Sequence, residues 1–220
     1  MEKQFSTRAE IFQLTKMLVG KIKPTAFIEI GSRDGYDANL IGKFWDVPAY
    51  IVEPHPDLAA LTRERYPEIN VYEFAAFNKD GEAKFNAFKI NPNSQINSVV
   101  VGTSSLLEPI YIKAPRNIVT VPTKRMDTFL AETNISVDIV KIDVEGVGYE
   151  VLEGFGDRLK DMKAIQIELE KVEMFKGQTL VDATLELMSK HFILYNVKKE
   201  NEFQFAHLFI NKSIAYLMTS

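Results

Sequence analysis

Short apolar runs alternate with amphipathic stretches along the chain from residue 25 onward. Apolar runs bounded by turn-forming residues predict buried strands, whereas apolar positions three or four residues apart predict helices. On this pattern we predict strands at 25–30, 49–53 and 69–75 and helices at 36–45 and from Pro56. Strands that alternate with helices in this way form a parallel sheet with right-handed crossovers.

The second half of the chain continues the alternation after an interruption. A turn and a short strand at 80–88 are followed by an Asn-, Ser- and Pro-rich stretch at 89–121, which we predict to be a long functional loop. Helices and strands then follow in turn, at 122–133, 138–143, 149–155, 164–170 and 180–191. The stretches 192–199 and 204–212 predict a closing antiparallel pair of strands, and the start of the chain predicts an amphipathic lid helix at 7–22.

Composition narrows the class of protein. The 220 residues hold no repeat or linker, so we predict one domain over 1–220. A net charge of −4 gives no footprint for general nucleic-acid binding, and the lack of cysteine excludes disulfides and thiolate chemistry. Neither a secretory signal nor an apolar run of about 18 residues is present, so we expect a cytoplasmic protein without a membrane span.

The loop "EIGSRDG" after the first strand has the shape of a nucleotide-binding turn but the wrong chemistry for phosphate. A dinucleotide fingerprint needs a glycine at the position of Arg33, and Asp34 would repel a pyrophosphate. A P-loop needs Lys after its last glycine, but Tyr36 follows Gly35 here. Both features argue against a nicotinamide oxidoreductase and favour a ligand without phosphate.

S-adenosylmethionine is a ligand that meets this condition. Glu29 could hold its ammonium group, directly or through water, and backbone N–H groups at the helix start could bind its carboxylate. Glu53, at the end of the second strand, could accept hydrogen bonds from the ribose diol. We place the adenine beside Ala76 and Phe77, after the third strand.

A second set of charged residues follows the strand at 138–143. Strand periodicity places Lys141, Asp143 and, if the chain stays extended, Glu145 on one face at the carboxyl end, which is costly unless these charges meet water, a ligand or one another. Asp143 is the first candidate to contact an acceptor, with Glu145 and Glu168 next, and Lys141 could orient a carboxylate. The three carboxylates could also bind a divalent cation, but no metal-ligand spacing indicates one.

These residues together resemble the FkbM-type S-adenosylmethionine-dependent methyltransferases. The resemblance is carried by Glu29 to Tyr36, Glu53-Pro54, Met126 to Leu130, Lys141 to Gly146 and Val151-Leu152-x-Gly154. Glu29 replaces the usual Asp, Ser32-Arg33 the usual Ala-Asn, and Met126 the usual Leu. The resemblance implies a class I, Rossmann-like α/β fold, a three-layer sandwich around a seven-stranded, mostly parallel sheet whose last strand is antiparallel.

The resemblance also implies O-methylation of a hydroxyl on a sugar or other small molecule. We expect the catalytic residues to be Asp143, Glu145, Lys141 and Glu168, and the cofactor-binding residues to be Glu29, Gly31, Ser32, Arg33, Asp34, Gly35, Tyr36, Glu53, Pro54, Ala76, Phe77 and Asp143. Hydroxyl and amide groups of the 89–121 loop would bind a polyol acceptor, namely those of Asn97, Ser98, Ser104 and Ser105. The alternative is a non-catalytic module of the same fold that binds the cofactor or a protein partner.

Overall fold

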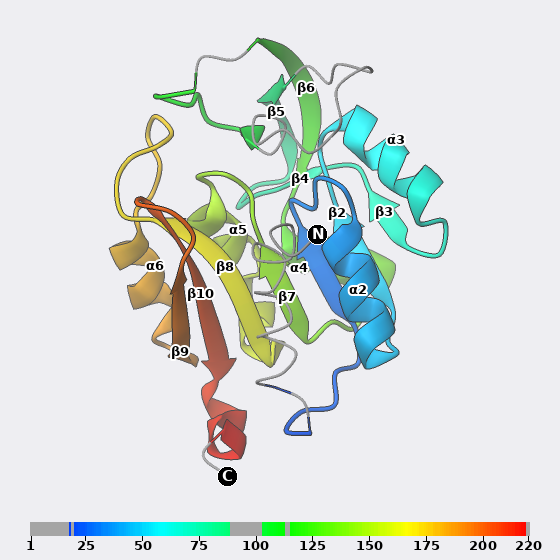
Figure 1. Cartoon of the computed structure of the whole chain (residues 1–220), viewed down its shortest axis with the longest axis vertical. Coiled ribbons are helices and arrows are strands. Elements are labelled where there is room, and N and C mark those ends of the chain that lie inside the picture. Colours follow the sequence, from blue (N-terminus) through cyan, green and yellow to red (C-terminus); the bar gives the residue numbers. More distant parts are fainter. Residues whose placement is uncertain (1–17, 19, 89–102, 113–114, 219–220) are drawn as a thin grey trace, which may run out of the picture.

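The computed structural model describes residues 18, 20–88, 103–112 and 115–218. Strands and helices alternate through most of this range (Figure 1). The strands are β1 (Phe27–Ile30), β2 (Ala49–Val52), β3 (Asn70–Tyr72), β4 (Ala75–Ala76), β5 (Gly81–Phe88), β6 (Arg116–Lys124), β7 (Ile139–Ile142), β8 (Ala164–Glu170), β9 (Phe192–Lys199) and β10 (Gln204–Asn211). The helices are α2 (Tyr36–Trp45), α3 (Pro56–Arg65), α4 (Met126–Thr133), α5 (Gly148–Gly154), η3 (Gly156–Asp161), α6 (Val181–Met188) and η4 (Lys212–Met218).

The main sheet has seven strands in the order β3-β2-β1-β7-β8-β10-β9. β10 runs antiparallel to both of its neighbours, and the other neighbouring strands are parallel. The predicted α/β fold with an antiparallel last strand is therefore confirmed. Strand order reverses between β1 and β7, so the loops that follow these strands open the crevice in which α/β sheets bind ligands.

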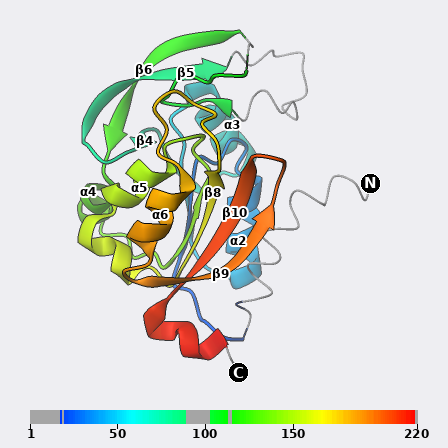
Figure 2. The same cartoon turned by 90° about the vertical axis from the view of Figure 1, so that its left-hand side faces the viewer.

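Helices cover both faces of this sheet, as the view in Figure 2 shows. On one face, apolar side chains of α4, α5, η3 and α6 pack against residues such as Ile28, Val140 and Ile167. On the other face, α2, α3 and η4 cover Phe27, Ile51 and Leu208. The four residues of β1 are buried, which explains the uniformly apolar run that predicted the strand, apart from Glu29.

A second sheet of three strands, in the order β4-β6-β5, stands beside the first (Figure 1). It corrects two predictions, because Arg116–Lys124 is a strand and not part of a loop, and α4 begins at Met126 and not at residue 122. The stretch 69–75 is also divided, since β3 ends at Tyr72 and Ala75–Ala76 pairs with β6. The Asn- and Pro-rich surroundings concealed β6, which is held by its register with β5.

Two predicted segments fall largely outside the described residues. Of the predicted helix at 7–22, residues 1–17 and 19 lie outside them, while Leu18 and Ile22 are buried against the α2 face of the sheet. Asn97 and Ser98 also lie outside the described residues, whereas 103–112 are described. Among the helices that are described, none has the length and apolar character needed to cross a membrane.

Candidate active site

The loop between β1 and α2 lies directly against the end of β7. Gly31 has a φ of 81°, and a Cβ at this position would lie 1.9 Å from the backbone oxygen of Asp143. The Asp143 amide donates to the Ile30 carbonyl at 2.9 Å, and the Gly31 amide donates to the Val52 carbonyl at 2.9 Å. Glycine is therefore required here by both its backbone conformation and the close approach of two chain segments.

Glu29 supports this loop from beneath. Its fully buried carboxylate accepts hydrogen bonds from the Ser32 hydroxyl at 2.8 Å, the Ala38 amide at 3.1 Å and the Lys141 ammonium at 3.0 Å. These protein groups take up the positions that we had assigned to a ligand's ammonium. Glu29 therefore fixes the shape of the loop, and its carboxylate is not placed to meet a ligand directly.

Lys141 belongs to the same buried network. Its ammonium contacts Asp37 at 2.6 Å and Glu29 at 3.0 Å and lies 3.8 Å from Asp143. Burial alone would lower the pKa of Lys141, but these three carboxylates together raise it well above its usual value. Lys141 is thus a permanent cation that orients the carboxylates around it.

Glu53 holds the end of β2 against the same loop. Its buried carboxylate accepts from the Arg33 amide at 3.0 Å and from the His55 amide at 2.8 Å. Burial raises the pKa of Glu53, although these two backbone donors oppose the shift. The side chain lines a cavity, so its remaining lone pairs face the place where a ribose diol is expected.

The cavity lies above the carboxyl ends of β1, β2 and β7 and encloses about 520 Å³ of empty space, part of it open to solvent. Polar and charged side chains line one part of its wall, and apolar side chains the other. The lining residues are Ile30, Gly31, Arg33, Val52, Glu53, Pro54, Leu58, Ala75, Ala76, Phe85, Ser104, Leu106, Asp143, Val144, Glu145 and Val147.

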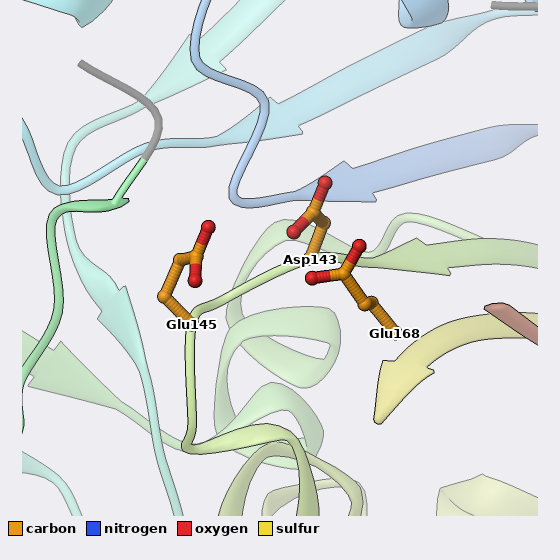
Figure 3. A group of neighbouring side chains, drawn as sticks. All are labelled: Asp143, Glu145 and Glu168. Carbon is orange, nitrogen blue, oxygen red and sulfur yellow. The ribbon is translucent and has the colours of Figure 1, made fainter. Parts of the chain in front are cut away.

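Three carboxylates meet at the edge of this cavity, from the ends of β7 and β8 (Figure 3). Asp143, Glu145 and Glu168 each present an oxygen, and these oxygens lie within 4.8 Å of one another. The chain is not extended through Glu145, because β7 ends at Ile142 and Glu145 has a left-handed φ of 52°. The cluster can accept a proton, or it can bind a divalent cation.

Burial and neighbouring negative charges raise the pKa of two carboxyls here, Glu145 in the cluster and Glu170 close to it. Burial, followed by the charges of Asp143, Glu168 and Glu170, raises the pKa of Glu145 well above its usual value. Burial likewise raises the pKa of Glu170 to about 7, with Asp143 contributing. Groups whose pKa approaches the working pH can exchange protons with a substrate, which is the property that acid–base catalysis needs.

The 103–112 segment covers this edge of the site. The Ser105 hydroxyl donates to the Glu145 carbonyl at 2.6 Å and accepts from the Leu107 amide at 3.0 Å. Ser105 is 1% exposed, so its predicted role in binding an acceptor is not supported by its position. Ser104 does line the cavity, and its hydroxyl accepts from the Phe88 amide at 3.1 Å.

The structure brings about half of the predicted cofactor-binding residues to the cavity wall. Gly31, Arg33, Glu53, Pro54, Ala76 and Asp143 line it. Glu29 and Ser32 brace the loop from behind, and Gly35, with a φ of 71°, precedes α2. Asp34 and Tyr36 also lie outside the lining set, where the Tyr36 amide donates to Asp34 at 3.2 Å.

Phe77 corrects the prediction for the adenine site. It does not line the cavity, and its carbonyl would lie 2.2 Å from a Cβ at Gly154, so it packs against the end of α5. The apolar wall is formed by Leu58, Phe85 and Leu106, which the sequence analysis missed. Leu58 could have been found as an inward position of the helix after Glu53, but Phe85 and Leu106 reach the cavity only through the second sheet.

The remaining motif of the resemblance has a structural role. The Arg125 guanidinium forms two hydrogen bonds to the Asp127 carboxylate, at 2.9 and 2.6 Å, and a third to the Asn78 carbonyl at 2.9 Å. This pair joins the start of α4 to the segment after β4. Gly154 allows α5 to approach the same segment, because a Cβ there would lie 2.2 Å from the Phe77 carbonyl oxygen.

The site fits the chemistry of S-adenosylmethionine. Its acidic side chains suit the ammonium and sulfonium groups, and the Glu53 carboxylate on its wall is a hydrogen-bond acceptor of the kind that a diol needs. Leu58, Ala75 and Phe85 offer an apolar surface for adenine. Arg33 and the buried Asp34, by contrast, remain unsuited to a dinucleotide pyrophosphate.

Comparison with known proteins supports this interpretation. The family model described as "Methyltransferase FkbM domain" matches residues 29–205. The chain is 25% identical over 170 residues to the 2-O-methyltransferase NoeI of Sinorhizobium fredii (strain NBRC 101917 / NGR234), an alignment that covers 73% of this chain and 70% of that protein.

Solved structures share the fold at low sequence identity. M. capricolum TrmK, in complex with S-adenosyl-homocysteine, matches with a TM-score of 0.50 and 12% identity, over 91% of this chain and 68% of that one. A fibrillarin/NOP5p complex matches with a TM-score of 0.53 and 10% identity, over 86% of this chain and 74% of that one. The chain therefore belongs to the FkbM family of methyltransferases, and its cofactor is S-adenosylmethionine.

Proposed function

We propose that the protein transfers a methyl group to a hydroxyl oxygen of a sugar or a similar small molecule. The relative in Sinorhizobium fredii is a 2-O-methyltransferase, which supports an oxygen acceptor. The observation that carries the proposal is the carboxylate cluster of Asp143, Glu145 and Glu168 at the edge of the cavity. A hydroxyl loses its proton when it is methylated, so a nearby proton acceptor is the group that such a site needs.

The cavity wall supplies the contacts that would hold the cofactor. Glu53 would accept from the ribose hydroxyls, while Leu58, Ala76 and Phe85 would pack against the adenine. Glu29 and Lys141 take no direct part, but they keep the loop in the conformation that leaves room for the ligand. Holding two reactants in one orientation supplies much of the rate in such a displacement.

When bound, S-adenosylmethionine supplies a methyl group on a cationic sulfur, so that the acceptor oxygen forms a C–O bond as the C–S bond breaks and its electron pair returns to sulfur. Asp143 lies on the cavity wall at the end of β7 and is our first candidate to take the hydroxyl proton. Glu145, whose pKa is raised, can keep a proton and donate a hydrogen bond to a second oxygen of the acceptor. Glu168 is fixed by the Gln204 amide at 2.6 Å and faces both of them.

The proposal is tested by separating cofactor binding from methyl transfer. Sugars and other small hydroxyl compounds would be screened as acceptors with radiolabelled S-adenosylmethionine, and the best one would be used to compare Asp143→Asn with Glu53→Ala. We expect Asp143→Asn to lower turnover by about 100-fold or more while S-adenosylhomocysteine affinity stays within about threefold. Glu53→Ala should instead weaken that affinity.

Equal turnover in Asp143→Asn and the wild type would remove Asp143 from the mechanism. Cofactor binding without transfer to any hydroxyl compound would favour the non-catalytic module. Transfer only to nitrogen or carbon acceptors would keep the protein a methyltransferase but overturn the proposed acceptor.

A further inference from the structure

Arg33 lies in the middle of the cofactor loop and departs from the family pattern, which has Asn at this position. Its φ of 56° is left-handed, a conformation that a long side chain seldom adopts. The Glu53 carboxylate helps to hold this backbone by accepting from the Arg33 amide at 3.0 Å. The side chain lines the cavity between Gly31 and Glu145.

Arg33 is opposite in charge to the other charged side chains of the cavity wall. Three acidic residues line the cavity, Glu53, Asp143 and Glu145, and Arg33 is the one basic residue among the lining side chains that the structure describes. Such a wall favours the ammonium and sulfonium groups of S-adenosylmethionine, but it repels the carboxylate of the same molecule. A carboxylate that enters this cavity needs a cation or a set of N–H donors.

The other cations beside the loop are already occupied. Lys141 is held by Glu29 and Asp37, and Arg65 lies 4.0 Å from Asp34 on the outer side of the loop. The Arg33 guanidinium, in contrast, forms no ion pair with the described part of the chain, although its charge is close enough to the Glu145 carboxyl to oppose the rise in that group's pKa. Its planar group can donate two parallel hydrogen bonds to a carboxylate.

We propose that Arg33 binds the carboxylate of the methionine portion of S-adenosylmethionine, and so makes this site select for a cofactor that carries the whole amino acid. The proposal deepens the cofactor assignment and rests on it. Arg33 also separates that carboxylate from Asp143 and Glu145, which would otherwise repel it. The carboxylates of the acidic cluster then contact the hydroxyl acceptor and not the cofactor carboxylate.

The test compares two ligands that differ only in this carboxylate. S-adenosylmethionine and decarboxylated S-adenosylmethionine would each be titrated by calorimetry into the wild type, Arg33→Ala, Arg33→Lys and Arg65→Ala. Arg65→Ala is the matched control, because it removes a cation beside the same loop that does not line the cavity. Thermal denaturation would confirm that each variant is folded.

We expect Arg33→Ala to weaken S-adenosylmethionine binding by roughly tenfold or more, as for the loss of a charge-assisted hydrogen bond. Binding of the decarboxylated ligand should stay the same or tighten, because a cation near its ammonium has been removed. Arg33→Lys should fall between the wild type and Arg33→Ala, and Arg65→Ala should match the wild type.

Two outcomes would overturn the inference about Arg33. One is an equal loss of affinity for both ligands in Arg33→Ala, which would show a role in shaping the loop. The other is an unchanged affinity for S-adenosylmethionine. A wild type that binds neither ligand would be a different result, since it would contradict the cofactor assignment itself.

Discussion

Replacing Gly31 with alanine would place a methyl group against the backbone at the end of β7. The new Cβ would lie 1.9 Å from the Asp143 oxygen, whereas real Cβ atoms keep at least 3.0 Å from such atoms. The loop and the end of β7 would therefore have to separate by roughly 1 Å, because the atoms that the new Cβ would meet at Asp143 belong to the backbone and not to a flexible side chain. This separation would break the hydrogen bond from the Asp143 amide to Ile30.

The free energy of unfolding should fall by about 2–3 kcal/mol in Gly31→Ala. A left-handed φ costs an alanine about 1–2 kcal/mol, and the lost hydrogen bond adds about 1 kcal/mol. For a protein of this size each kcal/mol lowers the melting temperature by about 2–4 °C, so we expect a decrease of about 4–12 °C. Affinity for S-adenosylhomocysteine should also fall, since the displaced loop forms the cavity wall.

Gly177 offers a matched control. Its φ of 77° is close to that of Gly31, but a Cβ there would meet no atom within 4 Å. Gly177→Ala should therefore cost only the backbone term, about 1–2 kcal/mol, and leave S-adenosylhomocysteine affinity unchanged. Melting curves and calorimetry on both variants measure these quantities. Equal losses of stability in the two variants would refute the argument from close approach.

Two further predictions concern the covered edge of the site. The Glu170 carboxyl has a pKa of about 7 in the folded state, against a reference value of 4.5. Between these pH values the folded protein therefore holds a proton on Glu170 that the unfolded chain has lost, so stability falls as pH rises from about 4.5 to 7. Glu170→Gln should reduce this fall in melting temperature between pH 5 and 8, and parallel curves for variant and wild type would contradict it. Ser105→Ala removes the hydrogen bond to the Glu145 carbonyl, which holds the left-handed turn at Glu145 in place. We therefore expect turnover to fall while S-adenosylhomocysteine affinity is kept. Ser105→Thr, which retains the hydroxyl, should recover turnover, and a threonine variant as slow as the alanine variant would argue against this role.

The local pattern of apolar and polar residues was sufficient to predict most strands of the main sheet. Mostly apolar runs marked β1, β2 and β7, because burial on both faces of a parallel strand favours apolar residues. Helical spacing and Pro56 marked the helices that follow β1 and β2. The meeting of Glu53 and Asp143 at one cavity could also be expected, since the carboxyl ends of the parallel strands of one sheet lie along the same edge.

Contacts between segments far apart in the chain determined the second sheet and the positions of the charged side chains in the site. β6 is defined by its pairing with β5 and β4, and this second sheet carries Phe85 to the cavity, whereas Phe77 is not among the lining residues. Lys141 and Glu145 shared a face in the sequence pattern, but the structure buries Lys141 beneath the loop with Glu29 and places Glu145, after a left-handed turn, on the cavity wall. Periodicity specifies which side of an element is apolar, but it does not specify which charges meet, because those distances depend on packing between elements far apart in the chain.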